Sequence, residues 1–159
     1  MNKPALIRKI IAQLTSELEL LMKAARAAHA EATHESSKAE NKYDTRGLEA
    51  SYLARGQSKQ AAEVAQAIQD FESLAVREFA AAEAIDVGAL VELKSKSESA
   101  FYFIGPRAGG TEVVHEKQEV LVITPQSPLG AQLVERKQGD NVKLAIAGAT
   151  SEFRIAAVS

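Results

Sequence analysis

Apolar residues near the start of the chain recur at alternating intervals of four and three positions. The repeat runs through Ile7, Ile11, Leu14, Leu18, Leu21, Ala25, Ala28 and Ala32. This spacing predicts a long amphipathic helix that packs along a partner helix. The seam changes from Ile and Leu to Ala, and small side chains let two backbones approach closely. We therefore expect a helical pair that becomes thinner toward residue 32.

A second apolar repeat predicts the partner helix. It comprises Ala50, Leu53, Val64, Ala67, Phe71 and Leu74, with polar Gln57 and Gln60 interrupting it. A narrow seam is typical of a free-standing antiparallel coiled coil, whereas a helix in a larger bundle shows a wider apolar stripe. The coiled-coil hairpin is the favoured interpretation, and a hairpin within a bundle is the alternative.

The pattern changes after about residue 83 to short apolar runs separated by Gly and Pro. Five of these runs predict β-strands: 88–95, 99–106, 119–124, 141–147 and 151–158. The stretch 120–124 is continuously apolar, as in a central strand, while 142–146 alternates, as in a strand with one face on the core. Leu129 and Leu133 predict a short helix between two of the strands. The chain is therefore expected to be α+β, with a mostly antiparallel sheet of four or five strands.

Composition fits two small domains, a hairpin at 1–83 with its charged tip near 35–46 and a β domain at 84–159. The net charge of −2 gives no general attraction to nucleic acid, and the absence of Cys excludes disulfides and thiolate metal sites. The sequence contains neither a signal peptide nor an apolar run long enough to span a bilayer. We expect a cytoplasmic protein with no membrane partner.

Common catalytic motifs for phosphate binding or for an activated nucleophile are missing. His29 and His34 are five positions apart and do not share a helical face, and His115 lies in an expected loop. We therefore expect no metal to be held by the isolated protein. The aromatic stretch 101–103 is expected to be strand core, with no aromatic-lined pocket in this half of the chain.

The segment ESSKAENKYDTR joins the two expected helices. It carries acidic Glu35, Glu40 and Asp44 among basic Lys38, Lys42 and Arg46. Mg²⁺ typically takes one or two protein carboxylates and keeps several waters, so these acids are candidate metal ligands. A solvated turn of mixed charge is the other interpretation. Arg46, Arg55 and Lys59 are expected to form a solvated face, because Arg46 and Arg55 lie about 180° apart on a helix.

Three segments resemble the Gre transcript-cleavage factors of bacterial RNA polymerase, the GreA/GreB family. The S-E-N-containing tip of that family is similar to S-K-A-E-N-K-Y-D at the turn of this hairpin. A strand ending in a V-G-P-like turn is similar to FYFIGPRAGGTE. The family signature I-S-x-x-S-P-L-A-x-A-L-x-G-K-x-x-G-D-x-V and its final strand are similar to VITPQSPLGAQLVERKQGDNVKLAIAGATSEFRIAAV. The resemblance covers nearly the whole chain in the same order.

The resemblance implies a mechanism as well as a fold. An FKBP-like C-terminal domain docks at the rim of the polymerase secondary channel, and the coiled coil passes down that channel. Tip carboxylates share Mg²⁺ with the polymerase active site, which then hydrolyses the 3′ end of a backtracked transcript. Such a factor is not an enzyme by itself. It contacts transcript RNA and DNA indirectly through the elongation complex, and we expect it to be monomeric.

Candidate site residues follow from this resemblance. Glu40 and Asn41 match the family's Glu-Asn pair, which makes Glu40 the leading residue to assist the metal. The family usually has Asp three residues earlier, where this chain has Ser37. Glu35 or Asp44 can take the place of that Asp if the tip is re-registered, and Tyr43 occupies the shifted tyrosine position of the tip.

Ser127, Pro128 and Leu129 match the segment implicated in polymerase docking, and they also suit the N-cap and first turn of a helix. Ser37 keeps several functions open. The leading hypothesis is an elongation factor that promotes transcript cleavage. The alternatives are a Gre-fold regulator that binds polymerase without stimulating cleavage, and a coiled-coil adaptor that binds another protein.

Overall fold

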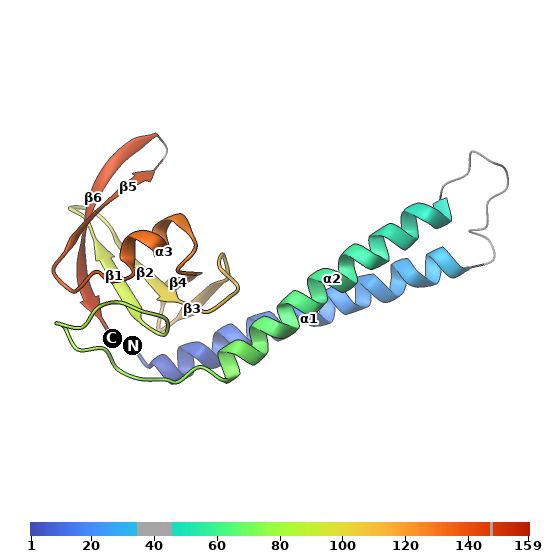
Figure 1. Ribbon diagram of the computed structural model, residues 1–159, viewed down its shortest axis with the longest axis horizontal. Coiled ribbons are helices and arrows are strands. Elements are labelled where there is room, and N and C mark those ends of the chain that lie inside the picture. Colours follow the sequence, from blue (N-terminus) through green and yellow to red (C-terminus); the bar gives the residue numbers. More distant parts are fainter. Residues whose placement is uncertain (35–45, 147) are drawn as a thin grey trace. The chain divides into compact units, whose positions relative to one another are not determined.

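The computed structural model of the protein describes residues 1–34, 46–146 and 148–159. Two long helices, α1 (Lys3–Thr33) and α2 (Arg46–Glu72), come first in the chain (Figure 1). Then follow β1 (Leu90–Lys94), β2 (Ser99–Ile104), β3 (Glu112–His115), β4 (Gln118–Ile123), α3 (Pro128–Leu133), β5 (Asn141–Ile146) and β6 (Ala149–Val158). The predicted α+β class, with a helical N-terminal part and one short helix among the strands, is confirmed.

The chain divides into two compact units. A hairpin unit comprises Leu14–Ile68, and a sheet unit comprises Met1–Gln13 together with Gln69–Ser159. The domain limits at 1–83 and 84–159 stay a prediction from the sequence. Within the described residues, no helix is long and apolar enough to cross a membrane.

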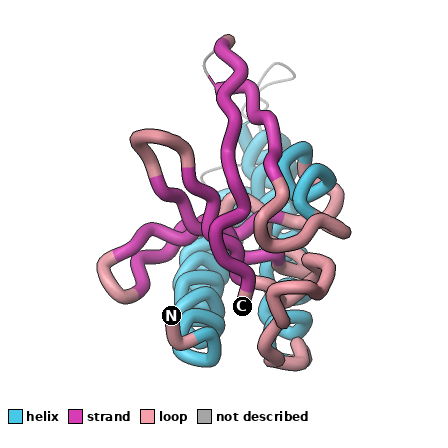
Figure 2. The backbone as a smooth tube through the Cα atoms, turned by 90° about the vertical axis from the view of Figure 1, so that its left-hand side faces the viewer, coloured by secondary structure: helices cyan, strands magenta, loops and turns pink. Residues whose placement is uncertain are grey.

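The sheet has the strand order β3-β4-β2-β1-β6-β5. Figure 2 shows its strands in magenta. Neighbouring strands are antiparallel except β2 and β4, which run parallel with Phe101 beside Val120. The expectation of a mostly antiparallel sheet is confirmed, but the sequence analysis missed β3. That strand has only four residues, and a two-residue turn of Glu116 and Lys117 joins it to β4. Both turn residues have positive φ, as a tight hairpin requires, yet neither is the Gly or Asn that signals such a turn in a sequence.

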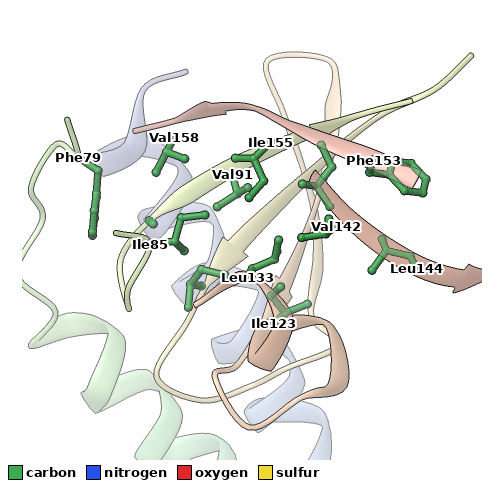
Figure 3. Packing of buried hydrophobic residues seen from close by; sticks show 13 residues of the cluster. Phe79, Ile85, Val91, Ile123, Leu133, Val142, Leu144, Phe153, Ile155 and Val158 are labelled. Carbon is green, nitrogen blue, oxygen red and sulfur yellow. The ribbon is translucent and has the colours of Figure 1, made fainter. Parts of the chain in front are cut away.

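The core of the sheet unit is a cluster of large side chains on one face of the sheet (Figure 3). Val91 and Leu93 of β1, Ile155 of β6 and Leu133 of α3 are fully buried within it. Strand β5 contributes Val142 and Leu144, and Lys143 between them is exposed, so the predicted alternation is confirmed. Burial of these side chains is the main favourable term that holds the sheet unit together.

The helical seam of α1 is confirmed, because all eight of its predicted positions are buried or half-buried. The prediction for α2 was partly wrong. Leu53 is 56% exposed, and Ala54 is buried in its place. Counting back from buried Ala61 by four and then three positions gives half-buried Gln57 and buried Ala54. The prediction chose Leu53 because its side chain is larger than that of Ala54. The side chain of Ala50 lies outside those that the structure describes.

The polar interruption of the α2 seam is partly confirmed. Gln57 is half-buried, and its Oε1 atom is buried without a hydrogen-bond partner among the described atoms. Gln60, the other polar residue predicted in the seam, is exposed. A buried acceptor without a donor costs free energy, so Gln57 weakens the packing of the hairpin unit.

Candidate functional site

The candidate tip residues all lie in one segment of the chain. Glu35, Ser37, Glu40, Asn41, Tyr43 and Asp44 fall outside the described residues. Helix α1 ends at Thr33 before this segment, and α2 begins at Arg46 after it. The tip therefore joins the ends of two helices, as the sequence predicts for the turn of a hairpin. The carboxylate roles at the tip stay predictions.

The candidate docking residues form the start of α3. Ser127 has extended backbone angles, and its Oγ accepts a hydrogen bond of 3.1 Å from the Gly130 N–H. The same hydroxyl donates to the Thr124 carbonyl at 2.7 Å. Pro128 follows as the first helical residue and Leu129 packs against the core, so the predicted N-cap is confirmed. These contacts fix the backbone direction of the loop, and Pro128 is exposed at its surface.

A glycine makes this loop as tight as it is. A Cβ atom on Gly130 would lie 1.8 Å from the Thr124 carbonyl oxygen, which is far inside contact distance. The family signature has Ala at this position. The chain departs from it with a residue that lets the 124–130 loop fold closely over the first turn of α3.

A second glycine, in the IGP motif, lets α2 approach the sheet. A Cβ atom on Gly105 would lie 2.8 Å from the ring of Phe71 in the last turn of α2. That ring packs against Phe103 of β2, with 6.1 Å between the ring centroids. Beside it the Arg107 Nε donates to the Asp70 carboxylate. Gly105 therefore allows the Phe71 ring to pack closely against the sheet.

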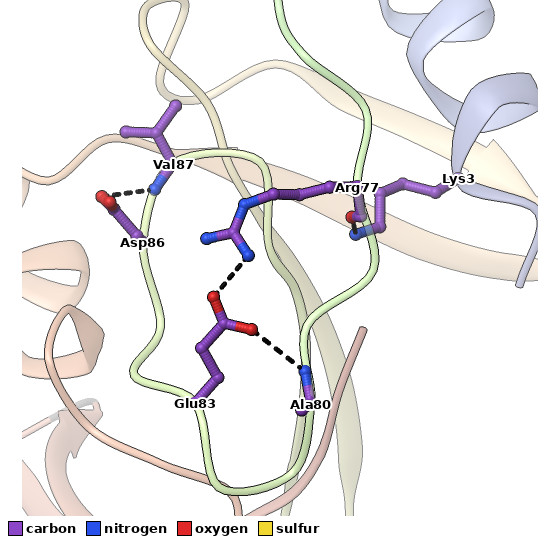
Figure 4. Close-up of polar contacts among 6 residues, drawn as sticks. All are labelled: Lys3, Arg77, Ala80, Glu83, Asp86 and Val87. Carbon is purple, nitrogen blue, oxygen red and sulfur yellow. Dashed lines mark hydrogen bonds and ion pairs between the residues drawn. The ribbon is translucent and has the colours of Figure 1, made fainter.

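A polar cluster anchors the first turn of α1 within the sheet unit (Figure 4). Lys3 is 1% exposed; its Nζ donates to the Arg77 carbonyl and lies 5.0 Å from the centre of the Phe79 ring. Burial lowers the pKa of the Lys3 ammonium from its ordinary 10.5. The central carbon of the Arg77 guanidinium also lies over the Phe79 ring, 3.8 Å from its centre. The same guanidinium pairs with the Glu83 carboxylate. Hydrogen bonds lower the pKa of the Glu83 carboxyl, and the bond from Arg77 contributes more than the bond from the Ala80 N–H.

The three histidines differ in their exposure. His29 and His34 are exposed on and just after α1. His115 was expected in a loop, but it ends β3 and is 5% exposed, with its Nε2 3.4 Å from the Glu116 carboxylate. Among the described residues, no group of three or more His, Asp or Glu side chains could hold a metal ion. Arg55 and Lys59 are exposed as predicted, and Arg55 lies against the exposed ring of Tyr52.

One cavity of the sheet unit was not predicted from the sequence. A cavity of about 440 Å³ lies between β2 and β4 and is lined in part by Phe101 and Tyr102. The expectation that this half of the chain has no aromatic-lined pocket was therefore wrong. Phe103, with no exposed surface, is strand core as expected. The cavity depends on which strands become neighbours, and no local pattern reports that.

Comparisons with known proteins gave matches among solved structures alone. No family model matches the chain, and no curated protein matches it. Among solved structures, the chain is 21% identical to GreA factor homolog 1 (Gfh1) of Thermus thermophilus, covering 94% of each chain with a TM-score of 0.38. It is 25% identical to Gfh1 of Thermus aquaticus, covering 95% of this chain and 92% of that one with a TM-score of 0.41.

A third solved structure is the elongation factor GreA/GreB of Nitrosomonas europaea. The chain is 17% identical to it, covering 70% of this chain and 92% of that one with a TM-score of 0.39. The chain is thus similar to structures described as a GreA factor homolog and as a GreA/GreB elongation factor.

Proposed function

We propose that the protein is a Gre-like transcription elongation factor that binds bacterial RNA polymerase in the cytoplasm. The observation that carries the proposal is the Ser127 cap. It sits within the SPLG…GD motif, in a loop whose conformation is fixed by hydrogen bonds and by Gly130. A rigid exposed turn at Pro128 suits recognition by another protein, because little conformational entropy is lost on binding.

The two helices support the second half of the proposal. They run from the sheet unit through the hairpin unit, and small residues such as Ala28, Ala54 and Ala61 line their seam. A thin antiparallel coiled coil can enter a channel that excludes a wider bundle. In this proposal the hairpin enters the polymerase secondary channel and brings the segment 35–45 to the active site.

The chemistry belongs to the polymerase, and this chain acts as a cofactor in trans. Mg²⁺ held in the polymerase active site would supply the activation of water and the stabilisation of the leaving oxygen of the transcript. Glu40 assists that metal, Asp44 or Glu35 supplies a second carboxylate, and Asn41 and Tyr43 shape the tip around them. The protein on its own is proposed to have no hydrolytic activity.

Stalled, backtracked elongation complexes test the proposal directly. Added with Mg²⁺, the wild-type protein is expected to release short 3′ RNA fragments. Glu40→Ala should abolish cleavage and leave polymerase binding unchanged, with a loss of about 2–4 kcal/mol of transition-state stabilisation. Glu63→Ala, an exposed carboxylate of α2, is the matched control and should cleave normally. No binding by the wild type would contradict the whole proposal, and unchanged cleavage by Glu40→Ala would reassign the carboxylate.

A second candidate function rests on Ser37. A tip with Ser where the family has Asp presents one carboxylate fewer to the metal. Under this alternative the protein binds polymerase through the Ser127 loop and does not stimulate cleavage. The same assay separates the two functions, since binding without 3′ fragments supports the regulator. Ser37→Asp should then introduce or increase cleavage.

A further inference from the structure

Part of one sheet face continues outward from the core to exposed side chains. Val91 of β1 is fully buried, and it pairs with Tyr102 of β2. Tyr102 pairs in turn with Leu121 of β4, which pairs with Glu112 of β3. Paired residues project from the same face, so these four form one row. Along the row the side chains pass from buried through half-buried to exposed.

A second row lies next to the first on this face. Two positions earlier on β2 and β4 are Ala100 and Glu119, and Val114 of β3 pairs with Glu119. Val114 is 60% exposed although it is apolar. Both rows therefore offer apolar surface with a carboxylate beside it.

The cavity opens where β2 and β4 cease to pair. The strands begin at Ser99 and Gln118, but their register begins only at Phe101 and Val120. The resulting hollow of about 440 Å³ has Glu112 and Lys117 among its lining residues. Its volume accommodates one or two side chains of a binding partner.

The lining has a distinct chemical character. In the part of the chain that the structure describes, no ion pair engages the carboxylates of Glu112 or Glu119, and Lys117 is the one cation in the lining. Burial raises the pKa of the Tyr102 phenol, so the ring stays neutral at ordinary pH. A neutral aromatic ring beside free carboxylates attracts a cation, and a planar guanidinium suits both groups.

We propose that the face formed by Tyr102, Leu121, Glu112, Glu119 and Val114 docks a basic segment of a partner protein. An arginine of that segment enters the cavity against Tyr102 and the two carboxylates, and a neighbouring aliphatic side chain covers Leu121 and Val114. The site is separate from the tip and from the Ser127 loop, so it adds a contact that the proposed function does not require.

Charge argues against two other occupants. Nucleic acid would bring phosphates to a hollow whose lining carries two carboxylates and one lysine. A symmetric dimer through the same patch would bring Glu112 and Glu119 of one copy to the patch that carries the same two carboxylates in the other, and like charges at an interface are unfavourable.

Amide NMR of the full-length labelled protein tests the proposal with two blocked tetrapeptides, Ac-Arg-Leu-Arg-Leu-NH₂ and Ac-Glu-Leu-Glu-Leu-NH₂. The basic peptide is expected to shift the signals of Tyr102, Glu112, Glu119 and Leu121 in a saturable way. The acidic peptide should leave them unchanged. Equal shifts with both peptides, or none on this face, would overturn the proposal. So would concentration-dependent shifts without peptide, which indicate self-association, or shifts with an oligouridylate.

Charge-reversal variants sharpen the same experiment. Glu112→Lys combined with Glu119→Lys should weaken basic-peptide binding at least tenfold. The matched control combines Glu19→Lys with Glu63→Lys, two exposed helical sites in the hairpin unit, and should bind as the wild type does. Tyr102→Leu keeps the apolar packing and removes the ring, so an affinity about threefold lower is expected from the lost cation–π contact. Equal affinity of the Glu112/Glu119 variant and its control would refute the site.

Discussion

The sheet unit and the hairpin unit are held together by different kinds of side chain. Val91, Leu93 and Ile155 in the sheet unit have no exposed surface. The buried residues of the hairpin unit are mostly alanines, and Ala28 and Ala54 keep 7% and 9% of their surface exposed. A large side chain that is fully buried stabilises far more than a methyl group at a seam. The difference predicts a rigid sheet unit and a hairpin unit that opens locally at lower cost.

The largest expected effect comes from shortening a fully buried side chain in the core of the sheet unit. Ile155→Ala should destabilise the protein by about 2–5 kcal/mol, because a large buried side chain is lost and a cavity is left. Ala61→Gly in the hairpin unit should cost only about 1 kcal/mol, mainly through helix propensity. Denaturant unfolding monitored by circular dichroism measures both. Hydrogen exchange should show amides of α2 between residues 50 and 62 exchanging faster than those of β1 and β6. Equal protection in the two units would break the comparison.

Replacing one glycine in each unit by alanine should change the free energy of unfolding by an intermediate amount. The change should be destabilising in the sheet unit and stabilising in the hairpin unit. Gly130→Ala places a Cβ against the Thr124 carbonyl, and the loop must shift at a cost of about 1–3 kcal/mol. Gly56→Ala in α2 meets no atom within 4 Å and should stabilise the helix by about 1 kcal/mol. Thermal unfolding separates these outcomes. A Gly130→Ala variant as stable as the wild type would mean that the loop relaxes freely and is not a fixed docking surface.

The smallest expected effect concerns the buried charge of the sheet unit. The pKa of Lys3 is lowered by burial, with a smaller contribution from Arg77 that Glu78 opposes. Below this lowered pKa the folded state bears the full cost of the buried ammonium. As pH rises from the lowered pKa toward 10.5, the folded protein loses this proton while the unfolded chain keeps it, so the wild type gains stability.

The Lys3→Met variant lacks this group and should show no such gain. The difference in unfolding free energy between wild type and variant, measured by urea denaturation at pH 7 and pH 10, should therefore move in favour of the wild type. A constant difference would show that Lys3 titrates alike in both states. Other titrating groups, such as Tyr102, are common to both proteins and cancel in the comparison.

Local patterns were sufficient for much of this fold. The α1 seam, the alternation in β5 and the Ser127 cap depend on neighbours within a few positions, so the sequence carries them directly. The two-residue turn before β4 uses Glu116 and Lys117, and without a Gly or Asn signal the strand β3 was missed. Leu53 was misplaced because two registers of one helix fit a 3–4 spacing, and only packing against α1 selects Ala54.

By itself the sequence determined the α+β class, the α1 seam, the alternation in β5 and the Ser127 cap. Only the tertiary structure decided which strands are neighbours. The parallel pairing of β2 with β4 places Tyr102, Leu121 and Glu112 in one row, although they are up to 19 positions apart in the chain. The tertiary structure also opens the cavity between those strands, and it buries Lys3 with its Nζ 5.0 Å from the centre of the Phe79 ring. These contacts are long-range, and a local sequence pattern fixes which face a side chain takes without fixing the partner across the sheet.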